Sequence, residues 1–464
     1  MTIYIMGERC FDSMVSELGY GGFVAEVLRR LGVGLGDEVE VVRNGLRLRG
    51  FVMARYEFGE PDVLVLKLPN GYNMGVRVDA STQIRKLSSA VAPAFNPPPP
   101  APPRENLPRV MVVNTGGTIA SRIDYRTGGV KPALTASDLV SIVPEIAEKA
   151  NVSTEILMQV VSENMTSAHW TEIARKVDEL FRRGFDGVVI THGTDTMGYT
   201  AAALSFALQN PPGPVVLVGA QRSSDRPSSD AALNLLTAVE VAAWAPFAEV
   251  VVAMHAWHGD DTILIHRGTR VVKLHTSSRG AFQSINASPI ATKTPQGLKL
   301  LTTRFHKRGE DGYVFQPVFD ERVMLVKFFP GMKPETLELL VEGMGLRGVI
   351  LEGTGLGHVA SSFVPVLKKL REESVFVGMT SQCRFGRVNM NVYENGRDLM
   401  RAGAIPLDNM LPETAYVKLM WVLGKLGEKA SHEEVRSLML RDICGEIGGR
   451  TGPQPVFTGE TNFV

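Results

Sequence analysis

The segment Met111-Val-Val-Asn-Thr115-Gly116-Gly117-Thr118-Ile119-Ala120-Ser121 decides the fold of this 464-residue chain. The apolar residues from Val110 to Val113 predict a buried strand, which ends in two glycines flanked by two threonines. Glycine lets the backbone turn sharply and approach a ligand closely. Ligands bind outside the carboxyl ends of strands in a parallel α/β sheet, so we expect Thr118 at the mouth of a site, as a candidate nucleophile. The alternative is an ordinary strand-to-helix turn whose threonines cap the next element.

A second segment, Gly187-Val-Val-Ile-Thr191-His192-Gly193-Thr194-Asp195-Thr196-Met197, repeats this design about 75 residues later. A buried strand again runs into glycine and hydroxyl side chains ahead of a predicted helix. Two such strand ends supply two threonines, one aspartate and several backbone N–H donors. Turn chemistry alone does not explain that pairing, so we expect the two strand ends to converge on one site.

The motifs TGGTIA and THGTDTM together resemble the two signatures of bacterial-type L-asparaginases, and the similarity extends from about Val110 to about Leu426. The flanking segments resemble one branch of that family, the D-type subunits of the archaeal glutamyl-tRNA(Gln) amidotransferases. This resemblance implies a two-domain α/β core with a parallel sheet, preceded by a small β-barrel-like domain. It also implies hydrolysis of the side-chain amide of glutamine or asparagine.

The resemblance assigns the catalytic roles residue by residue. Thr118 attacks the carboxamide, and Tyr125 is the proton acceptor on a lid. Thr194 orients water or protonates the leaving amide, and Asp195 meets the α-amino group of the substrate. Lys273 follows two apolar residues and is expected to be buried. Because desolvation penalises an ammonium, a buried lysine can act as a base on a threonine hydroxyl.

Three further positions match the family's substrate contacts: Gly117, Ser162 and Glu163. A hydroxyl can donate to the substrate's α-carboxylate, and a carboxylate can receive its ammonium. Read from spacing alone, Ser162 is a helix cap, and Asp230 is likewise expected to cap the helix that follows it. His192 suggests a Ser-His-Asp mechanism, which we reject because the resemblance gives the role of base to Lys273. Backbone N–H groups at the glycine turn are expected to stabilise the oxyanion.

The length of the chain requires two or three domains. We predict a small β-rich domain over residues 1–90, a proline-rich linker over 91–108 and a large α/β catalytic domain over 109–319. A smaller α/β domain over 320–428 and a C-terminal extension over 429–464 follow. In the first domain, Asn44-Gly45 and Asn70-Gly71 each separate two apolar runs and predict two hairpins, hence four strands. Residues 1–90 carry 11 acidic and 11 basic side chains, which favours a protein-docking or covering module over nucleic-acid binding.

Composition limits the possible partners and cofactors. Lys+Arg and Asp+Glu number 49 each, which argues against a chain that grips polyphosphate by itself. The three cysteines form no ligand cluster, we find no GxxxxGK[ST] phosphate loop, and we expect no metal or cofactor in this chain. No signal peptide and no membrane-spanning segment is expected, so the predicted location is the cytoplasm.

Three hypotheses remain. The first is the glutaminase subunit of an amidotransferase that converts Glu-tRNA(Gln) to Gln-tRNA(Gln). The resemblance then implies a homodimeric core and a partner, the E-type amidotransferase subunit, which binds the tRNA(Gln) and uses ATP and Mg. The second is a free cytosolic L-asparaginase with additional segments. The third is a non-catalytic scaffold on the same fold, which the complete set of Thr118, Thr194, Asp195 and Lys273 disfavours.

Overall fold

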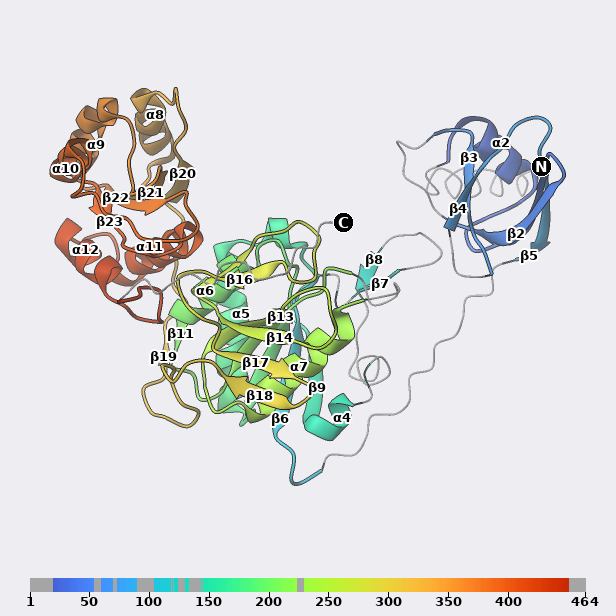
Figure 1. The fold of residues 1–464 in the computed structure, drawn as a ribbon, viewed down its shortest axis with the longest axis horizontal. Helices are drawn as coiled ribbons and strands as arrows, with labels where there is room; N and C mark the ends of the chain where they lie inside the picture. The colour runs from blue at the N-terminus through green and yellow to red at the C-terminus, as the bar shows by residue number, and fades with distance from the viewer. Residues whose placement is uncertain are drawn as a thin grey trace, which may run out of the picture. The chain divides into compact units, whose positions relative to one another are not determined.

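The structure is a computed structural model that describes residues 20–53, 60–69, 73–89, 104–117, 119, 121–123, 130–132, 143, 145–222 and 229–449. The chain divides into two compact units, which we describe separately (Figure 1). The first unit holds residues 1–98 and 121–133, and the second holds residues 99–120 and 134–464.

The first unit contains a five-stranded antiparallel sheet with the strand order β4-β3-β2-β1-β5. Its core is made of alternating valine and leucine side chains from the strands, covered by the apolar face of one helix. These elements are α2 (Gly22–Arg30), β1 (Glu38–Arg43), β2 (Leu46–Val52), β3 (Val63–Lys67), β4 (Asn73–Arg77) and β5 (Gln83–Ser88), and the unit also holds the paired strands β7 (Ser121–Ile123) and β8 (Val130–Pro132).

The hairpin predicted at Asn44-Gly45 is confirmed as β1–β2, and both turn residues have the positive φ that this dipeptide favours. Strands β3 and β4 pair as the second predicted hairpin, although Asn70 and Gly71 lie outside the described residues. The sequence analysis missed β5, which pairs with β1. Its residues, Gln83-Ile-Arg-Lys-Leu-Ser88, lack the apolar alternation that predicts a strand.

The second unit is built on an eight-stranded sheet with the order β18-β17-β14-β13-β12-β10-β6-β9 (Figure 1). The five strands from β13 to β9 run parallel, and β14, β17 and β18 continue the sheet antiparallel. The strands are β6 (Arg109–Asn114), β9 (Asn151–Ile156), β10 (Gly187–Thr191), β12 (Val215–Val218), β13 (Val250–His255), β14 (Ile263–Arg267), β17 (Ala291–Thr294) and β18 (Gly297–Leu300).

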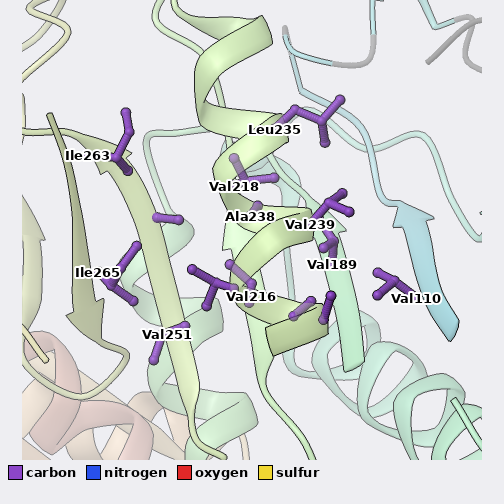
Figure 2. Packing of buried hydrophobic residues seen from close by; sticks show 14 of the residues in the cluster. Val110, Val189, Val216, Val218, Leu235, Ala238, Val239, Val251, Ile263 and Ile265 are labelled. Atoms are coloured by element: carbon purple, nitrogen blue, oxygen red, sulfur yellow. The ribbon is translucent and has the colours of Figure 1, made fainter. Parts of the chain in front are cut away.

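Helices cover both faces of this sheet, which is why its central strands are buried at every position and mostly apolar. On one face, Val110, Val189 and Val216 pack against α7, as Figure 2 shows. Met111, Val188 and the other alternate side chains pack against α5 and α6. The helices are α4 (Ile146–Lys149), α5 (Ser167–Arg182), α6 (Met197–Ala207) and α7 (Ala231–Trp244).

A four-stranded parallel sheet, β20-β21-β22-β23, follows in the same unit. Helix α11 packs on this sheet and against α6, where the rings of Trp421 and Phe206 stack with their centroids 5.8 Å apart. The elements are β20 (Val323–Lys327), α8 (Pro334–Met344), β21 (Gly348–Gly353), η3 (Ser361–Phe363), α9 (Val364–Glu372), β22 (Phe376–Ser381), α10 (Glu394–Ala402), β23 (Ile405–Pro406), α11 (Pro412–Leu426) and α12 (His432–Leu440).

Short elements complete the second unit: η2 (Ser162–Asn164), β11 (Leu208–Gln209), β15 (Val271–Lys273), β16 (Phe282–Ser284) and β19 (Val314–Phe315). The fold class predicted from the sequence, a two-domain α/β core with a parallel sheet preceded by a small β-barrel-like domain, is confirmed, and the N-terminal domain is an antiparallel five-stranded sheet. Among the described residues, no helix combines the length and apolarity needed to cross a bilayer.

The described part of the C-terminal extension, up to residue 449, is held in place by polar contacts with the rest of its unit. The N–H of Gly448 donates to Asn409 Oδ1 and its carbonyl accepts from Arg387. Two residues before Gly448, the Glu446 carboxylate lies 2.5 Å from the ammonium of Lys418 on α11, and neither side chain is exposed. Burial lowers the pKa of Lys418, although Glu446 acts in the opposite direction. This buried ion pair attaches the extension to α11.

We predict that Lys418→Met destabilises the protein by about 3–5 kcal/mol, because it leaves the Glu446 carboxylate buried without its cation. Calorimetric unfolding measures the effect as a lower midpoint temperature. Lys369→Met is the matched control, since its ion pairs are exposed and contribute about 1 kcal/mol or less. The double variant Lys418→Met/Glu446→Gln should recover most of the loss. A single Lys418→Met variant that unfolds at the wild-type temperature would contradict the prediction.

Candidate active site

The two strand ends that carry the threonine motifs lie side by side. β6 and β10 are neighbouring parallel strands, with Asn114 opposite Thr191 at their carboxyl ends. Beyond the paired residues, the N–H and the hydroxyl of Thr115 both donate to the Thr191 carbonyl, at 3.2 and 2.8 Å. The convergence of the two motifs expected from the sequence is therefore present. Thr118 itself and Tyr125 lie outside the described residues.

Glycines let these strand ends touch backbone to backbone. A Cβ added to Gly117, whose φ is +85°, would lie 2.6 Å from the backbone of His192 and Gly193. A Cβ on Gly116 would lie 2.4 Å from the Val160 carbonyl oxygen. Real Cβ atoms do not approach backbone this closely, so only glycine fits at either position. Gly117 therefore brings the first motif into backbone contact with the second motif.

Lys273 connects the second motif to a distant part of the chain. Its ammonium donates to Thr194 Oγ1 at 2.8 Å and to Asp195 Oδ1 at 2.7 Å. The Lys273 side chain is only 12% exposed, as expected, whereas that of Asp195 is 69% exposed. Because the Thr194 hydroxyl accepts from Lys273, its own proton remains available for a hydrogen bond to a substrate or a water. The sequence analysis expected Asp195 to meet the substrate's amine; its carboxylate already pairs with Lys273 through Oδ1.

Lys273 reaches Thr194 because its strand runs back along α6. A Cβ on Gly268 would meet the Ala201 carbonyl oxygen at 2.9 Å, and one on Gly198 would meet the Val271 carbonyl oxygen at 3.0 Å. The chain from Gly268 to Val271 therefore runs from the middle of α6 toward its first turn, which follows Thr194. The short spacing permitted by these two glycines brings the lysine to the end of β10.

The predicted substrate contacts Ser162 and Glu163 lie on the turn η2. The buried Ser162 packs against the second motif, since a Cβ on Gly193 would meet the Ser162 Cβ at 2.7 Å. The Thr196 hydroxyl also donates to the Ser162 carbonyl at 2.7 Å. Glu163 is exposed and has no hydrogen bond or ion pair among the described residues. Three strand ends thus meet at Gly117, Ser162 and Gly193.

Asn114 is a contributor that the sequence analysis missed. Its Oδ1 accepts the Gly116 N–H at 2.8 Å and the Thr191 hydroxyl at 3.2 Å, so it fixes the glycine turn. The Gly116 N–H is consequently not a free donor for an oxyanion. Within the described part of the chain, the buried Nδ2 of Asn114 has no partner. Asparagine commonly accepts from the backbone two residues ahead, and this was the available signal.

Asp230 holds a neighbouring strand end and does not cap α7 in the way that was predicted. Its buried carboxylate accepts the N–H groups of Gln221 and Arg222 at 2.9–3.1 Å, and also Asn234 Nδ2 at 3.1 Å. Asn234 donates in turn to the Gly219 carbonyl, and its Oδ1 lies 2.6 Å from His255 Nδ1. This network secures the turn that follows β12. An aspartate just before a helix can either cap that helix or bind a different turn. The sequence is the same in both cases, so it could not show which role Asp230 has.

His192 is fully buried, and burial lowers its pKa to about 4. A neutral imidazole enclosed by protein agrees with the rejection of a Ser-His-Asp mechanism. Among the described residues, no group of three or more His, Cys, Asp or Glu side chains is placed to hold a metal ion. A cavity of about 550 Å³ lies elsewhere in this unit, lined in part by Arg267, Arg270 and Asp442, and none of the site residues lines it.

Three family models match successive parts of the chain. The GatD N-terminal domain matches residues 33–87, the N-terminal asparaginase domain matches residues 109–305, and the glutaminase/asparaginase C-terminal domain matches residues 322–439. The D-type glutamyl-tRNA(Gln) amidotransferase subunit of Thermofilum pendens is 49% identical over 93% of this chain and 97% of its own length. That of Pyrococcus furiosus is 48% identical over 93% of this chain and 98% of its own length. The chain belongs to the family of D-type glutamyl-tRNA(Gln) amidotransferase subunits, the GatD family.

Solved asparaginases align with 74% of this GatD family member. The L-asparaginase of Thermococcus kodakarensis aligns with a TM-score of 0.66 and 35% identity, covering 74% of this chain and 100% of that one. L-asparaginase I of Vibrio cholerae aligns with a TM-score of 0.65 and 29% identity, covering 74% of this chain and 99% of that one. The chain is therefore an asparaginase-type amidohydrolase with an additional N-terminal β domain.

We predict that Gly117→Ala lowers the rate of ammonia release from glutamine on the order of a hundredfold, because its methyl group must displace the backbone before Thr194. The matched control is Gly331→Ala. Gly331 has nearly the same φ, +89°, but has nothing within 4 Å of the added Cβ. Both variants carry the backbone strain of about 1–2 kcal/mol, and only Gly117→Ala carries the collision. Equal activities of the two variants would show that the close approach is not required.

Proposed function

We propose that the chain is the ammonia-generating glutaminase subunit of an amidotransferase that converts Glu-tRNA(Gln) to Gln-tRNA(Gln). The observation that carries this proposal is a cluster at the end of β10 in a chain of the GatD family: one ammonium bridges the Thr194 hydroxyl and the Asp195 carboxylate. A hydroxyl, an amine and a carboxylate in contact can exchange the protons that amide hydrolysis requires.

In the proposed reaction the Thr118 hydroxyl attacks the side-chain carboxamide of glutamine. A bond forms from Oγ to the carbonyl carbon, the C–N bond breaks, and the nitrogen takes up a proton and leaves as ammonia. Water positioned by Thr194 then hydrolyses the ester and releases glutamate. Lys273 and Asp195 relay the protons. Backbone N–H groups stabilise the negative charge on the carbonyl oxygen.

The remaining predicted site residues hold and enclose the substrate in this proposal. Gly117 keeps room for the carboxamide, Ser162 donates to the α-carboxylate, and Glu163 receives the α-ammonium. The exposed position of Glu163 is compatible with that role, since a free carboxylate must be available to an incoming amine. Tyr125 accepts a proton near Thr118 from the lid.

The tRNA-dependent half of the reaction is assigned to a partner. We propose that the E-type amidotransferase subunit binds tRNA(Gln), activates the glutamyl group with ATP and Mg, and receives ammonia from a homodimeric core of this chain in the cytoplasm. The equal numbers of acidic and basic residues in this chain, 49 each, support that division of labour. No metal or cofactor is assigned to this chain itself.

The second candidate is a free L-asparaginase. It is favoured by the alignment of two L-asparaginases with this chain over nearly their whole length, while a quarter of this chain lies outside each alignment. The same cluster of Thr194, Asp195 and Lys273 would serve both reactions. The candidates differ in whether activity depends on a partner and on charged tRNA.

We predict that Thr118→Ala lowers ammonia release on the order of a thousandfold or more, because the attacking oxygen is lost. Thr118→Ser keeps a hydroxyl and should retain measurable activity. Ammonia from glutamine is measured for both variants beside the wild type, with circular dichroism to establish folding. A folded Thr118→Ala variant with wild-type activity would refute the nucleophile, and a wild type without any amidase activity would favour a scaffold.

Co-purification tests the assignment to an amidotransferase. The tagged chain is expected to retain a second, ATP-using and tRNA-binding subunit, and the pair should form Gln-tRNA(Gln) from Glu-tRNA(Gln), ATP and glutamine. Glutamine hydrolysis should also rise when Glu-tRNA(Gln) is added. If the isolated chain instead hydrolyses asparagine at full rate and acquires no tRNA-dependent activity with such a partner, the free L-asparaginase is the correct assignment.

A further inference from the structure

A chain of three hydrogen bonds runs beneath the second motif. Trp170 Nε1 donates to Thr200 Oγ1 at 3.1 Å, Thr200 Oγ1 lies 2.9 Å from His192 Nε2, and His192 Nδ1 lies 2.6 Å from the Gly193 carbonyl oxygen. His192 and Thr200 are completely buried, and Trp170 is only 5% exposed. No solvent reaches this chain of hydrogen bonds to supply alternative partners.

The chemistry of its two ends fixes the direction of every bond. An indole N–H can only donate, so the Thr200 oxygen accepts from Trp170. Because the Thr200 proton has no other acceptor among the described residues, it goes to His192 Nε2. A carbonyl can only accept, so His192 must donate from Nδ1 to Gly193. Both constraints require the same neutral tautomer, with the proton on Nδ1. An imidazolium would place a second donor against Thr200, whose own proton would then have no acceptor among the described residues.

We propose that His192 is a positioning residue: as its Nδ1–H tautomer, held by Trp170 and Thr200, it fixes the orientation of the Gly193–Thr194 peptide for amide hydrolysis. The inference rests on the proposed function for its catalytic consequence, but the tautomer itself can be observed without any reaction. It differs from a catalytic role for His192, because the ring is buried and contacts no substrate.

The orientation of that peptide matters because its two polar groups point in opposite directions. The peptide bonds of the described residues are all trans, so the Thr194 N–H points away from the carbonyl that His192 holds. No described residue accepts a hydrogen bond from this N–H. It is therefore a free backbone donor on the residue whose hydroxyl contacts Lys273. If the peptide rotated, the donor would turn toward the interior and the Thr194 hydroxyl would move with it.

Close packing holds the preceding peptide, His192–Gly193. An added Cβ on Gly117 would be 2.6 Å from the Gly193 nitrogen, and one on Gly219 would be 2.9 Å from the His192 carbonyl oxygen. These contacts act on the peptide before the Gly193 carbonyl. The hydrogen bond from Nδ1 acts on the Gly193 carbonyl itself and so orients the Gly193–Thr194 peptide.

The same bonds connect the two parts of the site. Trp170 lies on α5, which begins just after the Ser162 turn, and Thr200 lies on α6, which begins just after Thr194. The Thr196 hydroxyl adds a direct bond from the start of α6 to the Ser162 carbonyl. A shift of α5 against α6 would therefore disturb the Gly193 carbonyl and the predicted carboxylate contact together.

The tautomer is tested on the full-length wild-type chain labelled with ¹⁵N-histidine. Two-bond ¹H–¹⁵N correlation spectra distinguish a protonated Nδ1 from a protonated Nε2, and the His192 signals are assigned by their loss in His192→Asn and His192→Gln. We expect the Nδ1–H form in the wild type and a mixture of tautomers in Thr200→Val, where the hydroxyl is absent. A wild-type ring protonated on Nε2, or on both nitrogens at neutral pH, would overturn the proposal.

Two substitutions separate positioning from packing. The Asn amide nitrogen occupies nearly the place of His Nδ1, whereas the Gln amide nitrogen occupies nearly the place of His Nε2. Positioning predicts that His192→Asn keeps most of kcat and that His192→Gln loses on the order of a hundredfold, with KM little changed in both. Packing predicts the reverse order, because Gln fills the volume of His better than Asn. If Gln is the better replacement, the positioning role is wrong.

The tautomer measured by spectroscopy is independent of the proposed function. If ammonia release survives in Thr118→Ala, the proposed nucleophile falls, while the tautomer of His192 still stands or falls by its spectrum. If Thr118→Ala is inactive and His192 carries its proton on Nε2, the proposed function stands and the positioning role does not. Where a His192 variant does not fold, the wild-type and Thr200→Val spectra still decide the question.

Discussion

The site depends on the approach of three strand ends with backbone against backbone. Side chains normally keep neighbouring loops about a side chain's width apart, whereas Gly116, Gly117 and Gly193 allow contacts that any Cβ would prevent. The cost is entropic, because glycine loses the most conformational freedom on folding. Hydrogen bonds from Asn114, Thr115 and other buried polar side chains restore order to these turns. The glycines that let the strand ends touch therefore require buried hydrogen bonds nearby that hold the turns in one conformation.

Buried polar groups beneath the site act as a scaffold more than as reagents. Asp230, Asn234 and His255 secure the turn after β12, while Trp170 and Thr200 secure His192. Each buried donor in these networks has an acceptor, as the cost of an unsatisfied buried group requires. The groups that remain available to a substrate belong to the cluster of Thr194, Asp195 and Lys273: they are the Thr194 hydroxyl proton and the exposed Asp195 carboxylate. This separation lets the site hold reactive groups in place without enclosing them.

Much of this arrangement was predictable because it follows from local patterns. The apolar strands, the glycines at their ends and the Asn44-Gly45 hairpin are all signals within a few residues, and parallel-sheet geometry then predicts that the strand ends converge. The partners of polar groups were not predictable, because they depend on residues far apart in sequence. Asp195 and Lys273 are separated by 78 positions, and the residues next to each of them do not indicate that the two form an ion pair. Asp230 was misread for the same reason, since its anchor role depends on the turn at Gln221.

The path to Lys273 shows how distant segments can be needed for a local contact. The residues before β15 are held at the far end of α6 by the C-terminal extension: Arg270 donates to the Gly445 carbonyl at 2.8 Å and the Thr269 hydroxyl to the Cys444 carbonyl at 3.0 Å. Burial lowers the pKa of Arg270 to about 10, and its Nη1 and Nη2 each donate to Asn409. A guanidinium whose three nitrogens all donate is a rigid support, because rotation would break several bonds at once. The strand that delivers the lysine is thus fixed at one end by the extension and at the other by Thr194 and Asp195. A three-residue strand has too few ladder bonds to hold such a position alone, so the extension belongs to the support of the site as much as the sheet does.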